Sequence, residues 1–231
     1  MKRTTWLRKN HKWLALVSGL QVFVWAISGL YMVSVNIDII HGDHLVKTTQ
    51  VEAIGKEPLT PISEQVISRI ESIKSIQLTR FFGTAFYRIN SLNGISIVDA
   101  KTGHLALTLP RERIKEITKQ IYAGDASILS IELLSDYPSE LRSKDQPIWR
   151  VTFDDIVSST LYFHYQTGQL VSKRTDLWRT FDFLWKLHII EYFGFDGYVG
   201  WIFRLLSILS LAMAILGSFL LYYRLKSVAQ Q

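Results

Sequence analysis

The chain has 231 residues and no cysteine, and its 26 Lys and Arg residues outnumber its 20 Asp and Glu residues. The absence of thiols excludes disulfides, thiolate metal sites, iron–sulfur clusters and covalent c-type haem attachment. All 20 acidic residues lie between Asp38 and Asp196, a span that also contains 18 Lys and Arg residues. The basic excess therefore belongs to the two ends of the chain, and the mildly acidic middle argues against nucleic acid as a partner.

The first long apolar segment runs from Trp13 to Val35, 23 residues without a charge. A helix of that length crosses the roughly 30 Å hydrocarbon core of a bilayer. The run exceeds the core of a signal peptide, and no small-residue cleavage site follows it, which favours an uncleaved anchor. We predict a cytoplasmic N-terminus at 1–12 and a transmembrane helix at 13–35. One stripe of this helix needs either a helix partner or a planar cofactor: Gln21, Trp25, Ser28, Gly29 and Met32.

After a juxtamembrane segment at 36–58, two stretches resemble each other. The first reads Tyr87-Arg-Ile-Asn followed by an alternating strand that ends in Thr102-Gly103; the second reads Trp149-Arg-Val-Thr followed by one that ends in Thr167-Gly168. Each Thr-Gly pair suits a tight hairpin turn, because glycine accepts a positive φ.

A helical pattern precedes each of these strand sets. Aliphatic residues recur at helical spacing over Pro61–Lys74 and again over Pro110–Tyr122, where Pro110 suits a helix start. We therefore predict two helix-plus-antiparallel-sheet repeats, at 59–109 and 110–175, that share a sheet or pack together.

The chain ends in an amphipathic helix at 176–197, a second transmembrane helix at 198–223 and a tail at 224–231. The uncharged core of the second span is Leu205–Tyr223, and its small residues form a seam: Ser207, Ser210, Ala214 and Gly217. Basic residues flank both spans on the side of the termini: Lys2, Arg3, Arg8, Lys9, Lys12, Arg224 and Lys226. The positive-inside rule then places both termini in the cytoplasm and the middle domain outside, in the periplasm of a Gram-negative bacterium.

Several of these motifs together resemble a known family. They are Arg8-Lys9-x-His11-Lys-Trp-Leu, Trp25-x-x-Ser28-Gly29-Leu-Tyr-Met32, His41-Gly42-Asp43-His44, Leu187-His188 followed by Tyr192, and the two Thr-Gly turns. In order and placement they are similar to PepSY-associated transmembrane proteins, over nearly the whole chain. The resemblance implies an inner-membrane protein with PepSY domains, and some larger members of the family are ferric-siderophore reductases that bind b-type haem through histidines. This chain has two predicted spans where those reductases have four or more, so a four-helix haem bundle would need a homodimer or another subunit.

Three histidines are the candidate haem ligands. His44 and His188 fall near the outer ends of the two spans, and His188 lies on an apolar helix face beside Trp185, which suits an axial imidazole. His11 lies at the cytoplasmic end, a membrane thickness away, so that two sites at opposite faces would serve transmembrane electron transfer. The plainer interpretations are a satisfied core histidine for His188 and a basic interfacial residue for His11. Zinc bound by His41, His44 and His188 is a further alternative.

The sequence thus predicts an α+β membrane protein whose two transmembrane helices flank an extramembrane domain of two PepSY-like repeats. Its expected function is that of a b-type haem-binding redox component in the bacterial inner membrane, linked to reduction of ferric complexes such as siderophore iron. The alternative is a non-enzymatic, membrane-tethered module that binds or assembles a periplasmic or membrane partner. The expected partners are the lipid bilayer and a second copy or other subunit, and no phosphate-binding loop or hydrolase motif indicates another reaction.

Overall fold

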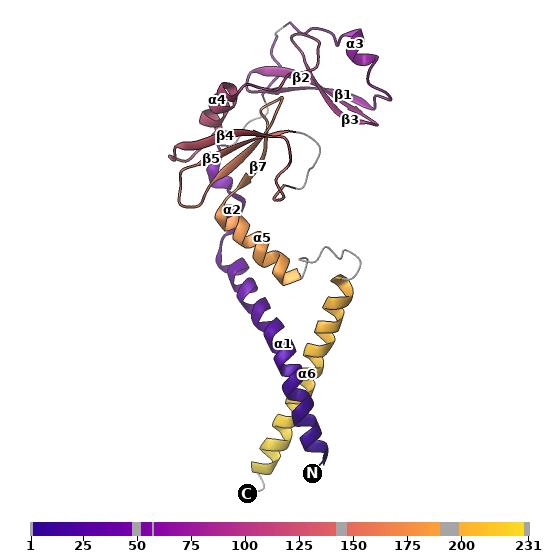
Figure 1. Ribbon diagram of the computed structural model, residues 1–231, viewed down its shortest axis with the longest axis vertical. Coiled ribbons are helices and arrows are strands. Elements are labelled where there is room, and N and C mark those ends of the chain that lie inside the picture. Colours follow the sequence, from indigo (N-terminus) through magenta and orange to yellow (C-terminus); the bar gives the residue numbers. More distant parts are fainter. Residues whose placement is uncertain (1, 48–51, 57, 142–146, 190–198, 229–231) are drawn as a thin grey trace. The chain divides into compact units, whose positions relative to one another are not determined.

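The computed structural model describes residues 2–47, 52–56, 58–141, 147–189 and 199–228. They form two compact units, a helical unit of Met1–Ile37 with Thr180–Gln231 and a middle unit of Asp38–Arg179. The fold is mixed α+β with two sheets (Figure 1). In chain order the elements are α1 Lys2–Ser34, α2 Ile37–His41, η1 Asp43–Leu45, α3 Glu64–Ile67, β1 Ser75–Phe81, β2 Thr84–Ser91, β3 Gly94–Asp99, α4 Arg111–Ile121, β4 Ile128–Leu134, β5 Ile148–Phe153, β6 Thr160–His164, β7 Leu170–Arg174, α5 Asp176–Ile189 and α6 Val199–Val228.

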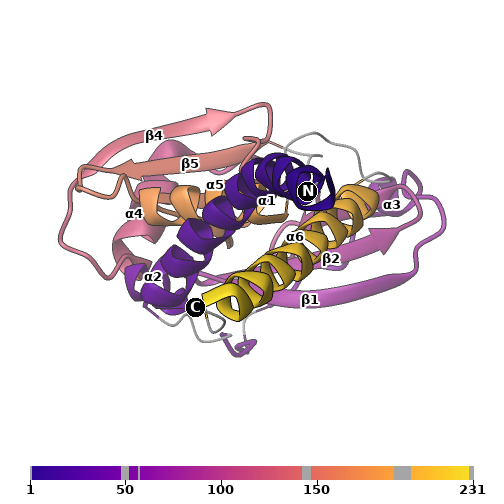
Figure 2. The same ribbon diagram turned by 90° about the horizontal axis from the view of Figure 1, so that it is seen from below.

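The helical unit is built on α1 and α6, which contact each other and cross (Figures 1 and 2). Within these helices, His11–Ser34 and Arg204–Lys226 are each long and apolar enough to cross a membrane. Their large apolar side chains remain exposed: Leu20 by 67%, Val33 by 81% and Leu211 by 63%. Two helices that bury so little apolar surface against each other leave most of it for another environment.

The expected contact stripe on α1 does lie against protein. Ser28 is fully buried, and the other four members of the stripe are half-buried: Gln21, Trp25, Gly29 and Met32. The seam predicted on α6 is buried only in part, because Ser210 and Gly217 are half-buried whereas Ser207 and Ala214 are exposed.

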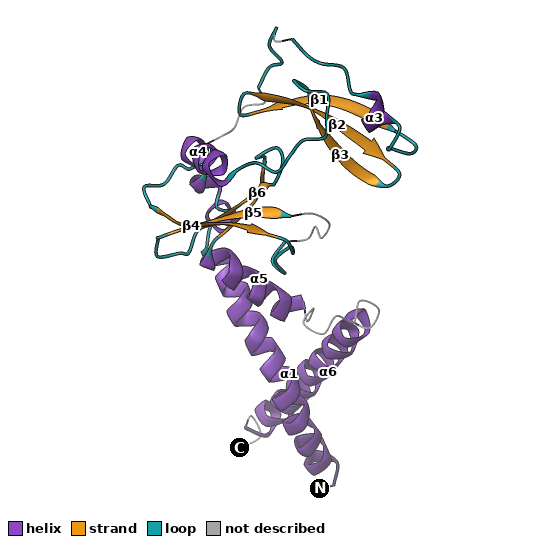
Figure 3. Ribbon diagram, turned by 45° about the horizontal axis from the view of Figure 1, so that its top comes forward, coloured by secondary structure: helices purple, strands orange, loops and turns teal. Residues whose placement is uncertain are grey.

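The middle unit contains two antiparallel sheets, of order β1-β2-β3 and β4-β5-β6-β7 (Figure 3). The two repeats therefore do not share a sheet. Alternation along β2 and β5 places Ile89 and Val151 on buried faces, and both side chains are fully buried. Each of these faces packs against residues of the helix that precedes its sheet.

Helix α4 confirms the pattern predicted over Pro110–Tyr122, with Pro110 as its N-cap residue. Its isoleucines at helical spacing, Ile114, Ile117 and Ile121, are buried against β4, β5 and β6. Burial of one such side chain stabilises the fold by about 1.5–3 kcal/mol.

The helix predicted over Pro61–Lys74 is wrong in extent, because α3 spans only Glu64–Ile67. Between its isoleucines α4 has two Lys, one Glu, one Gln and one Thr, whereas this stretch carries three serines and two adjacent β-branched residues, which favour helices less. Ser72 then adopts a positive φ of 51° that no helix contains. The apolar pattern still describes the packing, because Val66 contacts the buried face of the first sheet.

The two Thr-Gly turns have matching geometry. Gly103 and Gly168 have φ of 72° and 69°, as predicted. In each turn the glycine N–H donates to the carbonyl at the strand end, Asp99 or His164, at 2.8 and 3.0 Å. The side chains of those same two residues accept the backbone N–H groups inside the turn.

Helix α5 agrees with the predicted amphipathic helix over its described length. The Thr175 hydroxyl accepts the Trp178 N–H at 3.1 Å, as an N-cap residue does. Residues 190–198, which hold the remainder of that predicted segment, Tyr192 and the first residue of the predicted second span, lie outside the described residues.

We expect Gly103→Ala to lower the free energy of unfolding by about 2–4 kcal/mol, because an added Cβ would meet both a left-handed φ and backbone. That Cβ would lie 2.3 Å from the Pro61 carbonyl oxygen. Gly83→Ala is the matched control: its φ is 79°, but nothing lies within 4 Å of an added Cβ. Gly83→Ala should lower the free energy of unfolding by about 1–2 kcal/mol, which is the cost of the left-handed φ alone. Urea unfolding followed by circular dichroism measures both, and equal losses in the two variants would contradict the packing at Gly103.

Candidate functional site

His188, near the end of α5, is held against α1 by two hydrogen bonds. Its Nδ1 lies 2.8 Å from the Ser28 hydroxyl, and its carbonyl oxygen accepts the Trp25 indole N–H at 2.9 Å. The imidazole and indole ring centroids are 6.1 Å apart. The half-buried stripe of α1 therefore supports a histidine, which the sequence alone did not connect with it.

The contacts of Ser28 are compatible with a His188 tautomer that carries its proton on Nδ1. The Ser28 hydroxyl also lies 2.8 Å from the Val24 carbonyl, to which it can only donate. With the hydroxyl proton directed to Val24, the Ser28 oxygen accepts from His188, and in that tautomer the imidazole proton sits on Nδ1 and Nε2 keeps its lone pair. This is the arrangement in which an outer partner orients a metal-binding histidine.

His11, at the other end of α1, lies against α6. Its Cε1 is 3.4 Å from where a Cβ on Gly217 would be, so the predicted small-residue seam makes room for an imidazole. Its Nδ1 is buried and has no hydrogen-bond partner among the described residues. His11 and Ser28 are 17 residues apart, about 25 Å along the helix, so His11 and His188 lie at two separate levels.

His44 belongs to the middle unit, in the short helix η1, and its side chain is exposed, as is that of His41. Asp43 between them binds Lys173 at 2.5 Å, and this hydrogen bond lowers the pKa of the Asp43 carboxyl. Among the described residues, no group of three His, Cys, Asp or Glu side chains could hold a metal ion, so the zinc alternative gains no support from the geometry.

A haem bound through two histidines would need one imidazole from each side of its slot. His188 fits the part of one ligand, since Ser28 orients its ring and leaves Nε2 available. Among the described residues of the helical unit, His188 is the histidine near one end of α1 and His11 is the histidine near the other end. At each of these two depths the chain therefore offers one of the two histidines that such a haem site would need.

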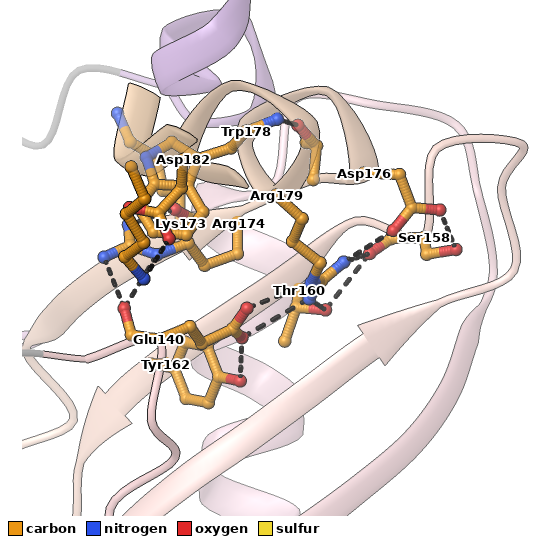
Figure 4. Close-up of polar contacts among 12 residues, drawn as sticks. Glu140, Ser158, Thr160, Tyr162, Lys173, Arg174, Asp176, Trp178, Arg179 and Asp182 are labelled. Carbon is orange, nitrogen blue, oxygen red and sulfur yellow. Dashed lines mark hydrogen bonds and ion pairs between the residues drawn. The ribbon is translucent and has the colours of Figure 1, made fainter. Parts of the chain in front are cut away.

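A different polar cluster fixes the first turn of α5 on the second sheet (Figure 4). The Glu140 carboxylate accepts the Tyr162 hydroxyl at 2.5 Å and the Arg179 Nε at 2.9 Å. Burial, and then Glu140, raise the pKa of Tyr162. Arg179 also binds Asp176 at 2.9 Å, so these ion pairs anchor the first turn of α5.

His164, which the sequence did not single out, has a specific role at the end of β6. Its Nδ1 lies 3.3 Å from the backbone nitrogens of both Gln166 and Thr167, whose N–H groups it accepts. Burial, and then the nearby Arg88, lower its pKa. The signal in the sequence was its alignment with Asp99, whose carboxylate accepts the equivalent groups in the first turn.

Comparison with protein-family models, with curated proteins and with solved structures finds no match for this chain. The functional argument therefore rests on the residues themselves.

We expect the wild-type protein to lose more stability than His164→Asn when the pH falls from 7.5 to 5. The unfolded chain protonates His164 near its ordinary pKa of about 6.5, whereas the folded protein keeps it neutral, so acid favours the unfolded state below that pH. Asparagine keeps the acceptor in the turn and removes the titration. Urea midpoints at the two pH values measure the effect, with His104→Asn, at an exposed turn position, as the control. Equal pH responses of wild type and His164→Asn would contradict it.

Proposed function

We propose that the chain is a two-pass protein of the bacterial inner membrane, with cytoplasmic termini and a periplasmic middle unit. The exposed apolar surfaces of α1 and α6 support this, because in water they would be a large unfavourable area. The distribution of charge supports it as well: the acids are confined to 38–196, and basic residues flank both helices. The middle unit is then a pair of PepSY-like repeats, consistent with two helix-then-sheet segments that carry matching turns.

The proposed function is that of a b-type haem-binding redox component linked to reduction of ferric complexes. The observation that carries it is the His188–Ser28–Val24 hydrogen-bond chain, which orients the imidazole through Nδ1 and is compatible with an Nε2 that can bind a metal. His11, with its buried unpartnered Nδ1, is the candidate at the other level, and His44 is a third candidate in the middle unit. A bound haem would supply a one-electron iron couple.

This proposal requires a second source of imidazoles. A second copy of the chain, packed about a two-fold axis, would place His188 opposite its equivalent and His11 opposite its own. Four helices would then surround each level. Another subunit with histidines at the same depths meets the same requirement, so we propose a homodimer or a larger membrane complex.

A membrane-tethered binding module is the second candidate, favoured by a cleft in the middle unit. The cleft has a volume of about 700 Å³ and is lined by Leu78 and Phe81 of β1 and by Leu170 and Lys173 of β7. Both strands are at the edges of their sheets. Edge strands flanking a largely apolar cleft are places where an extended segment of a partner is accommodated.

The topology predicts opposite reactivities for two introduced thiols in this cysteine-free chain. A membrane-impermeant maleimide should label Lys101→Cys in intact spheroplasts and Lys226→Cys only after lysis, since both side chains are exposed but on opposite sides of the membrane. Labelling of Lys226→Cys before lysis, or of neither site after lysis, would contradict the proposed orientation or exposure.

The redox function predicts a Soret band when the detergent-purified full chain is titrated with haemin, with sharpened bands after dithionite. His188→Ala should abolish the band of its site, and Ser28→Ala, which removes only the orienting partner, should weaken haem affinity roughly 10- to 100-fold.

The matched control is His104→Ala, which removes an exposed histidine of the middle unit and should leave the spectrum unchanged. Circular dichroism of each variant separates loss of a ligand from loss of helix. A wild-type protein that stays colourless with excess haemin would sink the redox proposal and favour the binding module.

A further inference from the structure

The two repeats place an arginine at the same position of each sheet. Arg88 follows Tyr87 in β2 and pairs across the strands with Gln77 and Ile97. Arg150 follows Trp149 in β5 and pairs with Glu132 and Tyr162. Because both arginines neighbour a fully buried aliphatic residue on their strand, strand alternation points them to the face opposite that core.

In the second repeat this arginine has a partner of opposite charge. Arg150 Nη2 binds the Glu132 carboxylate at 2.5 Å across the strand pair. The hydrogen bond from Arg150 lowers the pKa of Glu132. The second sheet thus neutralises its own arginine.

In the first repeat the partner is missing. The cross-strand position is Gln77, which is neutral, and Arg88 makes no hydrogen bond or ion pair with the residues that the structure describes. Its Nε is buried and has no hydrogen-bond partner among the described residues, as is also true of Arg150, so the two arginines differ at their terminal nitrogens, where Glu132 binds Arg150. A half-buried guanidinium in this state retains the desolvation cost without the compensating interaction.

Arg88 lines a cavity of about 470 Å³ within the middle unit. Among the described residues no acidic side chain lines it, and the other polar lining residues are Thr79, Asn93, Tyr137, His164, Thr167 and Gln169. His164 accepts backbone N–H groups at Nδ1, so its proton sits on Nε2, and the ring is a neutral donor. Phe81, Ile95 and Ile97 supply an apolar wall.

We propose that this cavity binds the carboxylate of an organic acid or of a peptide, with Arg88 as the charged anchor and the apolar wall holding the adjoining carbon chain. The ligand carboxylate takes the place that Glu132 has beside Arg150. A carboxylate is favoured over a phosphate because Arg88 is the one cationic side chain among the described residues that line the cavity, and it balances a single negative charge. The inference goes beyond the proposed redox function and does not depend on it.

The test titrates the full chain in detergent with hexanoate, with an N-acetylated leucine dipeptide acid and with the same dipeptide as its C-terminal amide, by isothermal calorimetry. Wild type should bind at least one acid saturably and the amide at least tenfold more weakly. Tighter binding of the dipeptide acid identifies a peptide as the source of the carboxylate, and tighter binding of hexanoate identifies a small acid.

The decisive variant is Gln77→Glu, which gives the first repeat the ion pair of the second and should weaken acid binding at least tenfold while leaving the unfolding midpoint as high as in wild type. Arg88→Gln should weaken binding equally. Lys101→Gln makes the same change in charge at an exposed position away from the cavity and should bind as wild type does.

Absence of saturable acid binding by wild type, equal binding of acid and amide, or unchanged binding by Gln77→Glu would each overturn the proposal. Haemin titration of Gln77→Glu should match wild type, so the two proposals fail separately.

Discussion

Alternation of side chains along the strands is the constraint on which the middle unit depends. Each short sheet needs one apolar face to pack against its helix, and the residues between those buried positions must then lie on the other face. Ile89 and Val151 are fully buried on one side, which puts Arg88 and Arg150 on the other. The core and the polar chemistry of each sheet are thus set by the same register, and a shift of one residue would exchange them.

The same division between buried and available groups applies to the helical unit. Trp25 and Ser28 lie on the protein-facing stripe of α1 and use their polar atoms on His188, whereas the apolar faces of α1 and α6 stay exposed. A histidine satisfied at Nδ1 by a serine can act purely to join two helices. The same bond also leaves Nε2 in the form that binds a metal, and the spectrum of the haemin-treated protein distinguishes these roles.

Local patterns gave the parts of the fold that local forces determine. The isoleucine spacing and Pro110 predicted α4, and the Thr-Gly pairs predicted two turns with positive φ. The helix over Pro61–Lys74 was overestimated, because apolar spacing describes which residues are buried and not how many turns their serine-rich neighbours sustain. Strands β1, β4 and β7 were not assigned, since their pairing is decided by partners distant in the sequence.

Candidate site residues depend even more on such long-range contacts. The sequence singled out His188 and, separately, the stripe that contains Ser28, but it could not connect the two residues, which are 160 positions apart. It drew attention to neither Arg88 nor His164, because the lack of a carboxylate beside Arg88 emerges only when Gln77 is seen in the place of Glu132. Gln and Glu codons differ by one base, so a single nucleotide change at Gln77 would be enough to give the first sheet the cross-strand ion pair that the second sheet has between Glu132 and Arg150.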